Sequence, residues 1–71
     1  MLEPQIHEVR RWYLSGPDFK IRCSTKDFAI KLGRIGRQAG KDVSLIEEYD
    51  LFDGDVHTDH QEFDRTILIS L

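Results

Sequence analysis

Residues 24–40 read STKDFAIKLGRIGRQAG, and this stretch decides the fold class. Ser24 and Asp27 have the spacing of a capping box, in which a hydroxyl and a carboxylate satisfy free backbone N–H groups at the start of a helix. Gly40 is the residue type that commonly ends a helix in a left-handed conformation. Between these ends, apolar side chains recur at helical spacing, at Phe28, Leu32, Ile35 and Ala39. We therefore predict one amphipathic helix whose apolar stripe covers a sheet.

Two segments on each side of this helix have the pattern of β-strands. Residues 7–14 are rich in Val, Trp and Tyr, and residues 19–23 alternate apolar and basic side chains after a turn at Gly16-Pro17. Residues 43–51 also alternate, but Glu47 interrupts their apolar side and predicts a bulge or an edge there. Residues 62–71 are predicted to form the last strand, paired with the preceding one. The sequence thus predicts an α+β fold of order ββαββ, with one helix packed on a four-stranded, mainly antiparallel sheet.

Length and composition predict a single domain, residues 1–71, because a chain of 71 residues has no room for a second core. Cys23 is the only cysteine, which excludes a disulfide within the chain and favours a reducing, cytoplasmic location. We expect this thiol to pack as a small hydrophobic group. Residues 1–11 lack the apolar core of a signal peptide, and no apolar run approaches the roughly 20 residues that cross a bilayer. We expect no membrane association.

A single short helix cannot cover both faces of a four-stranded sheet, so one face is expected to be bare or shared with another chain. Four apolar residues fall outside the faces assigned to the core: Trp12, Ile46, Phe52 and Leu68. Exposed apolar patches on small proteins mark interfaces, and the sequence therefore predicts a homo-oligomer. Gly33 and Gly36 share one side of the helix, where they permit close approach of another element.

Charge is distributed unevenly along the chain. Residues 1–40 hold eight basic and four acidic side chains, whereas residues 41–71 hold two basic and nine acidic ones. Our leading hypothesis is a non-catalytic protein-binding or regulatory module that self-associates and engages a larger partner through an acidic face, in the manner of a small inhibitor. The residues predicted to contact this partner are Trp12, Glu47, Glu48, Asp50, Phe52, Asp53 and Asp55.

A nucleic-acid-binding domain is the first alternative. Its phosphate contacts are predicted at Lys26, Lys31, Arg34 and Arg37 on the helix, supported by Arg10, Arg11, Lys20 and Arg22. A net charge of −3 lacks the overall electrostatic footprint of such a domain, so this function ranks below protein binding.

A small metal-binding protein is the second alternative. Three carboxylates and two imidazoles fall within eight residues, at Asp53, Asp55, His57, Asp59 and His60. The spacing departs from that of a calcium loop, because Thr58 stands where such a loop needs glycine. The simplest interpretation is a polar hairpin connection with solvated imidazoles, which still permits weak transition-metal binding.

Catalysis has the least support in the sequence. Cys23 is a possible nucleophile and His7, His57 or His60 a possible base, but no motif brings the thiol and an imidazole together. We therefore predict that the protein is not an enzyme and uses no cofactor.

Overall fold

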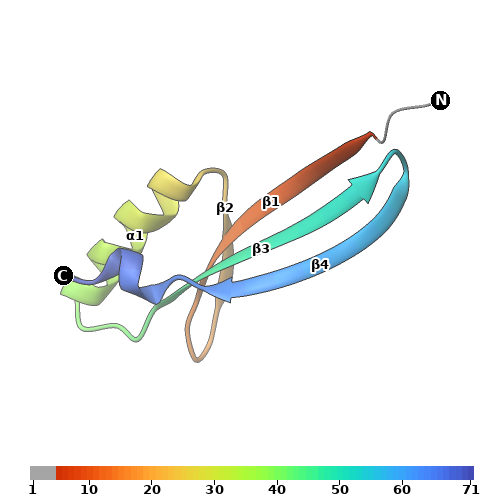
Figure 1. The fold of residues 1–71 in the computed structure, drawn as a ribbon. Coiled ribbons are helices and arrows are strands. Elements are labelled where there is room, and N and C mark those ends of the chain that lie inside the picture. Colours follow the sequence, from red (N-terminus) through yellow and green to blue (C-terminus); the bar gives the residue numbers. More distant parts are fainter. Residues whose placement is uncertain (1–4) are drawn as a thin grey trace.

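The computed structural model describes residues 5–71. The prediction that residues 1–11 lack a signal peptide therefore lies partly outside the described residues. The elements are β1 (Ile6–Ser15), β2 (Lys20–Cys23), α1 (Lys26–Gln38), β3 (Ser44–Asp53), β4 (Val56–Asp64) and a short 3₁₀ helix, η1 (Thr66–Ile69). The strands form one antiparallel sheet of order β2-β1-β3-β4 (Figure 1). The predicted α+β fold of order ββαββ is confirmed. No helix within residues 5–71 is long and apolar enough to cross a membrane.

Helix α1 begins one residue later than the capping-box prediction. Thr25, not Ser24, is the N-cap, and its hydroxyl accepts a hydrogen bond of 3.1 Å from the backbone N–H of Phe28. Asp27 lies in the first turn, where its charge is favourable to the helix dipole. Gly40 has a φ of 79° and follows the last turn, as predicted.

The helix turns a different face to the sheet from the one that its apolar stripe predicts. Its buried residues are Ala29 and Gly33, whereas Phe28 and Ile35 remain 50% and 54% exposed. The small residues allow the helix backbone to approach the sheet closely. A Cβ added at Gly33 would lie only 3.0 Å from Cγ2 of Ile69, which confirms the predicted close approach at the glycines.

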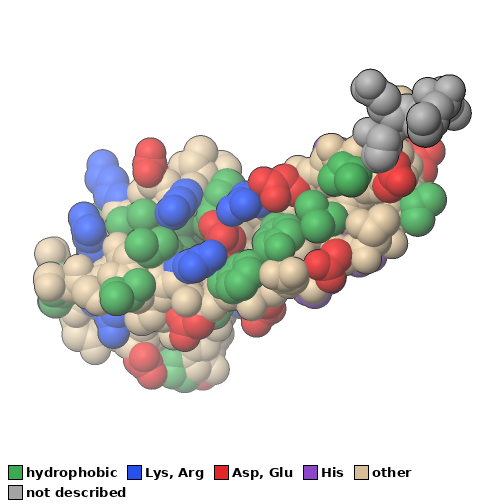
Figure 2. Space-filling model, viewed as in Figure 1, with side chains coloured by type: hydrophobic (Ala, Val, Ile, Leu, Met, Phe, Trp, Pro, Cys, Tyr) green, Lys and Arg blue, Asp and Glu red, His purple; other side chains and the backbone are tan. Residues whose placement is uncertain are grey.

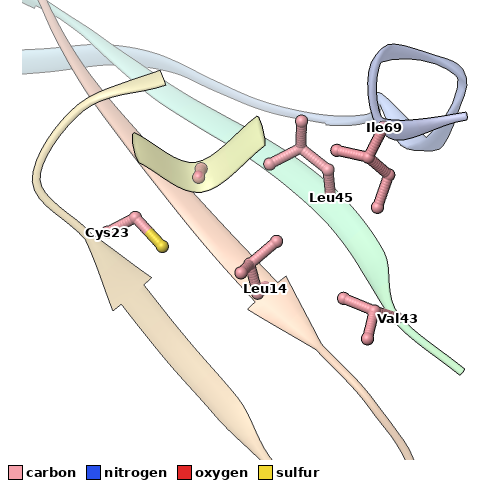
Figure 3. Close-up of a cluster of buried hydrophobic side chains, with 6 residues drawn as sticks. Leu14, Cys23, Val43, Leu45 and Ile69 are labelled. Atoms are coloured by element: carbon pink, nitrogen blue, oxygen red, sulfur yellow. The ribbon is translucent and has the colours of Figure 1, made fainter. Parts of the chain in front are cut away.

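The hydrophobic core is small and lies between α1, η1 and the inner ends of the strands. Its buried side chains are Leu14, Cys23, Ala29, Val43, Leu45 and Ile69 (Figure 3). Cys23 packs within this core as predicted, and burial raises the pKa of its thiol. Trp12 and Leu68, assigned to an exposed patch from the sequence, are partly buried against the core.

The last strand occupies a different segment from the predicted one. Strand β4 is Val56–Asp64, so His57 to His60 lie on a strand and not in a polar loop. The connection to β3 is only Gly54-Asp55, and Gly54 has a φ of 60°, as the first central residue of a tight type II′ hairpin turn requires. The Asp64 carboxylate accepts a hydrogen bond from the backbone N–H of Thr66. This contact ends β4, and Ile69 then enters the core from η1.

Glu47 is neither at a bulge nor at an edge, contrary to the sequence prediction. It lies on β3, a central strand, and the irregularity in the β3–β4 pairing falls at Leu51 and Phe52. The alternating pattern predicted strand β3 correctly. Glu47 is tolerated within it because ion pairs and hydrogen bonds satisfy its carboxylate.

The sheet extends far beyond the helix. Figure 1 shows α1, β2 and η1 gathered at one end while β1, β3 and β4 continue as an elongated arm, residues 6–11 and 47–64. We call residues 12–46 and 65–71 the body. The molecule measures 55 × 21 × 17 Å, and its radius of gyration is 15.0 Å, against about 11 Å for a compact chain of this length. Neither face of the arm is covered by a helix of residues 5–71.

Charge separates along this long axis. The arm holds two arginines, three histidines and nine carboxylates, whereas the body holds eight Lys or Arg residues and three carboxylates. Figure 2 shows Lys and Arg side chains over the helical end and Asp, Glu and His side chains along the outer arm. The charge asymmetry of the sequence is therefore also a spatial one.

Candidate functional site: the two faces of the arm

Glu47 organises the face of the arm that lies on the same side as α1. Its side chain is almost completely buried, and the indole N–H of Trp12 donates a hydrogen bond of 2.9 Å to Oε2. Arg10 and Arg65 donate to Oε1 over 3.3 and 3.4 Å. These four residues come from β1, from β3 and from the position directly after β4, and the Trp12–Glu47 register brings them together. We refer to them, with Tyr49 and Phe63, as the Glu47 cluster.

Two aromatic rings of the Glu47 cluster, those of Tyr49 and Phe63, pack against each other and against the two arginines. The rings of Tyr49 and Phe63 stack with centroids 5.7 Å apart. Arg10 lies over the Tyr49 ring at 5.4 Å and Arg65 over the Phe63 ring at 4.6 Å. Ring stacking and cation–π contacts of this kind hold the two rings and the two arginines in place, although these side chains are partly accessible to solvent.

Burial acts to raise the pKa of Glu47, but the Trp12 hydrogen bond and the two arginines outweigh it, so the pKa is lowered. The carboxylate is therefore charged at neutral pH and satisfied within the protein. It cannot offer its charge to a partner without losing these contacts.

Asp50 occupies the corresponding position on the opposite face of the arm. It is only 7% exposed, and one of its oxygens, Oδ1, accepts hydrogen bonds of 2.8 Å from Nε2 of His57 and from Nδ1 of His60. Arg11 donates to the other oxygen, Oδ2, and also to Glu48 over 2.8 Å. We refer to these five residues as the Asp50 cluster.

Hydrogen bonds set the ionisation of the Asp50 cluster. The bond from His60 is the largest of the causes that lower the pKa of Asp50 to about 2, and those from His57 and Arg11 add to it against the opposing effect of burial. The same hydrogen bond to Asp50 raises the pKa of His60. The His60 imidazole is therefore a better proton acceptor than an isolated one, because it lies against the Asp50 carboxylate.

All three histidines of the chain lie on this same face of the arm. The rings of His7, Phe52 and His57 form a row. The ring centroids of His7 and Phe52 are 5.3 Å apart, and those of Phe52 and His57 are 5.2 Å apart. The row follows from the register, in which Phe52 pairs with His7 on β1 and with His57 on β4.

The structure separates the residues of the predicted metal site. His57 and His60 meet at Asp50, whereas Asp53 and Asp55 lie at the hairpin and Asp59 pairs with Leu51 on the other face. Within the described residues, the one group with metal-ligand spacing is Glu48, Asp50 and His60. The guanidinium of Arg11 already bridges both carboxylates of that group. Arg11 thus offsets one of the two negative charges and occupies an oxygen of each carboxylate, which disfavours a metal ion there.

The residues predicted to bind a protein partner fall into three places. Trp12 and Glu47 share the helix side of the sheet, and Glu48, Asp50 and Phe52 share the opposite side, because alternate residues of a strand face opposite ways. Asp53 and Asp55 lie at the exposed end of the arm. The solvent-exposed acids of the arm also include Glu8, Asp59, Glu62 and Asp64, none of which the sequence analysis assigned to a protein partner.

The basic residues predicted to contact nucleic acid are placed on the body, except for two. Lys31 and Arg34 line a shallow groove on the outer side of α1, and Lys26 and Arg37 lie on the same helix. Lys20 and Arg22 lie on β2. Arg10 and Arg11 belong to the arm and are engaged with carboxylates.

The sequence analysis did not predict Tyr49, Phe63 or Arg65 as site residues. It assigned Arg11 to nucleic acid and did not predict its ion pair with Asp50. A signal was present, since Arg10-x-Trp12, Glu47-x-Tyr49 and Phe63-x-Arg65 each place a polar and an aromatic side chain on one face of a strand. The register between strands, which the sequence does not give, is what unites them.

We found no match for the chain among protein-family models, curated protein sequences or solved structures. Function is therefore argued from the geometry of the arm and the body.

Proposed function

We propose that this protein is a non-catalytic protein-binding module that self-associates, with the body of one copy covering the arm of another. The observation that carries the proposal is the helix side of the arm. It presents the aromatic rings and arginines of the Glu47 cluster, and no element within residues 5–71 covers it. Trp, Tyr and Arg are the residue types that dominate binding energy at protein interfaces.

Shape supports a second copy as the occupant. Helix α1 covers the inner half of one side of the sheet and leaves the outer half bare (Figure 1). A two-fold rotation that faces two such molecules antiparallel would lay each helix over the bare half of the other sheet. In a closed dimer of this type the same contact occurs twice, as in isologous interfaces, so the bare half of each sheet is covered.

Surface area supports the same arrangement. The chain exposes 5270 Å², compared with about 4,600 Å² for a compact monomer of 8.3 kDa. A stable interface removes about 800 Å² from each partner. Covering one side of the arm would return the exposed surface per chain to the range of a compact protein.

Charge supports the antiparallel direction. Among the body's cations, only Arg65 forms an ion pair with a carboxylate of residues 5–71. The arm meanwhile exposes acids such as Asp59 and Glu62. Opposite charges at the two ends favour an antiparallel encounter, in which the arm of each copy meets the body of the other. A larger partner with a basic surface could take the place of the second copy on the arm.

Static light scattering over a range of protein concentrations, at low and high salt, tests this proposal. A mass of twice 8.3 kDa that persists at high salt is expected, since buried aromatic contacts hold the dimer. Tyr49→Ala should shift the chain toward monomer, whereas Ile67→Ala, an 81% exposed residue of η1, should not. Circular dichroism confirms that both variants are folded. A monomer at every concentration would refute self-association.

The basic groove on α1 supports nucleic-acid binding as a second candidate function. Lys31 and Arg34 are spaced three residues apart and share one side of the helix beside a groove. Binding of a fluorescent single-stranded oligonucleotide measures this activity directly. A nucleic-acid-binding protein would lose affinity steeply with salt and with the Lys31→Ala and Arg34→Ala substitutions, whereas a protein-binding module would show neither effect.

A further inference from the structure

We propose that an apolar cleft between α1 and β2 is the seat for the end of the arm of a second copy. This inference rests on the proposed self-association and adds a specific contact to it. The two surfaces involved are the cleft in the body and the arm tip, which we define as Ile6, Asp53, Gly54, Asp55 and Val56.

The cleft is apolar and open. It has a volume of about 300 Å³, and most of its lining is hydrophobic, including Phe19 and Ile21 from the β2 side and Leu32 and Ile35 from α1. Lys41 is the charged residue of the lining. Phe19, Ile21 and Ile35 are 36%, 46% and 54% exposed, so the cleft leaves apolar side chains in water. Patches of this kind on small domains are typical of binding sites.

The cleft also adjoins a free strand edge. Strand β2 ends the sheet order and pairs only with β1 within the described residues, through Trp12–Ser15. Its outer backbone groups are therefore available to an approaching β-structure. A hairpin end could thus place side chains in the cleft while its backbone meets this edge.

The arm tip has the complementary chemistry. Ile6 and Val56 are 67% and 64% exposed, and the register places both beside Asp53, one on each neighbouring strand. Residues paired across strands point to the same face, so the tip presents two aliphatic side chains flanking a carboxylate. Asp55 is exposed in the adjoining turn. An apolar pair with carboxylates thus matches an apolar cleft with a lysine.

Position along the molecule supports the match. The hairpin end that carries the tip and helix α1, which lines the cleft, lie at opposite ends of the molecule (Figure 1), whose long axis measures 55 Å. An antiparallel arrangement of two copies therefore brings each tip to the other copy's cleft. Both surfaces also lie on the helix side of the sheet, because Ile6 shares its face of β1 with Leu14, which lines the cleft.

Directed disulfide formation tests this contact. Ile35→Cys and Val56→Cys are made as separate variants, mixed, and equilibrated in a glutathione redox buffer, and the products are identified by intact mass. The expected result is a disulfide-linked pair containing one chain of each kind, well above the amounts of the two like pairs. Ile67→Cys mixed with Ile35→Cys is the matched control, because residue 67 is at least as exposed as Val56 but lies outside the tip. It should give no enrichment.

Charge exchange provides a second readout that does not depend on cysteine reactivity. Lys41→Glu should weaken the dimer at least tenfold, and Asp55→Lys in the same chain should restore most of that loss. If light scattering shows a dimer but neither the disulfide nor the charge exchange appears, the tip lies elsewhere and this inference is wrong while self-association stands. If the chain is monomeric throughout, both proposals fail.

Discussion

Replacing Gly33 with alanine should destabilise the protein, although alanine favours a helix. The intrinsic gain of Gly→Ala in a helix interior is about 1 kcal/mol. The new Cβ would lie 3.0 and 3.1 Å from two carbons of Ile69 and 3.2 Å from a carbon of Leu14. Both neighbours are buried in the core and cannot move aside freely. Because both neighbours are buried, the overpacking cost should lie near the upper end of its usual range, at about 2–3 kcal/mol. After the helix gain is subtracted, we expect a net loss of about 1–2 kcal/mol.

Gly36→Ala is the matched control for this substitution. Its Cβ would meet one side chain only, with Cγ2 of Val43 at 3.1 Å, beside the open cleft. The helix gain should offset that contact, leaving stability within about 0.5 kcal/mol of the parent. Urea and thermal unfolding followed by circular dichroism measure both variants, at one protein concentration because association would raise the melting temperature. The reasoning is refuted if Gly33→Ala is as stable as Gly36→Ala.

Four further predictions concern the arm. Stability from Asp50, whose pKa is depressed to about 2, should be present above pH 4 and be lost as pH falls toward 2, and Asp50→Asn should remove this dependence in urea titrations. His60 has a raised pKa, so its contribution should be complete below its usual value near 6.5 and disappear as pH rises through the raised value; His60→Gln should flatten that slope. Glu47→Gln should cost about 1–3 kcal/mol, whereas Glu62→Gln, an exposed carboxylate on β4, should change stability by less than about 0.5 kcal/mol. Equal effects of the two substitutions would show that the Glu47 cluster contributes nothing. Gly54→Ala should cost about 1–2 kcal/mol by chemical denaturation, because φ of 60° is strained for alanine.

Local sequence signals predicted the elements with short-range causes. The helix and its closing glycine depend on residues within a few positions of one another, and so does the first hairpin. The face of the helix was predicted wrongly because Ala29 and Gly33 carry almost no hydrophobic signal, yet they make the closest contact with the sheet. Close approach of backbones depends on the absence of side-chain atoms, which apolar periodicity does not record.

The end of the chain was predicted wrongly for a different reason. Ile67, Ile69 and Leu71 alternate as in a strand, but the Asp64–Thr66 hydrogen bonds begin a 3₁₀ turn, and burial of Ile69 under α1 favours that turn. An apolar alternation of this length suits either structure, and the tertiary contact decides between them.

The candidate site was predicted only in part. Residues 47 and 50 were chosen because they are acidic, and the structure places both under arginines where their charge is internally satisfied. Their true neighbours, on β1 and β4, are 7 to 39 positions away along the chain. Only the strand register brings such residues together, and no local pattern specifies it.

Amide hydrogen exchange at two protein concentrations tests most directly the claim that a second copy covers the arm. One concentration should lie well below and one well above the association midpoint. The account predicts that amides of the arm and of the cleft exchange more slowly at the higher concentration, while core amides of Leu45 and Ile69 change little beyond the global stability gain. Exchange in the arm that is identical at both concentrations would contradict the account, because the arm would then remain uncovered in solution.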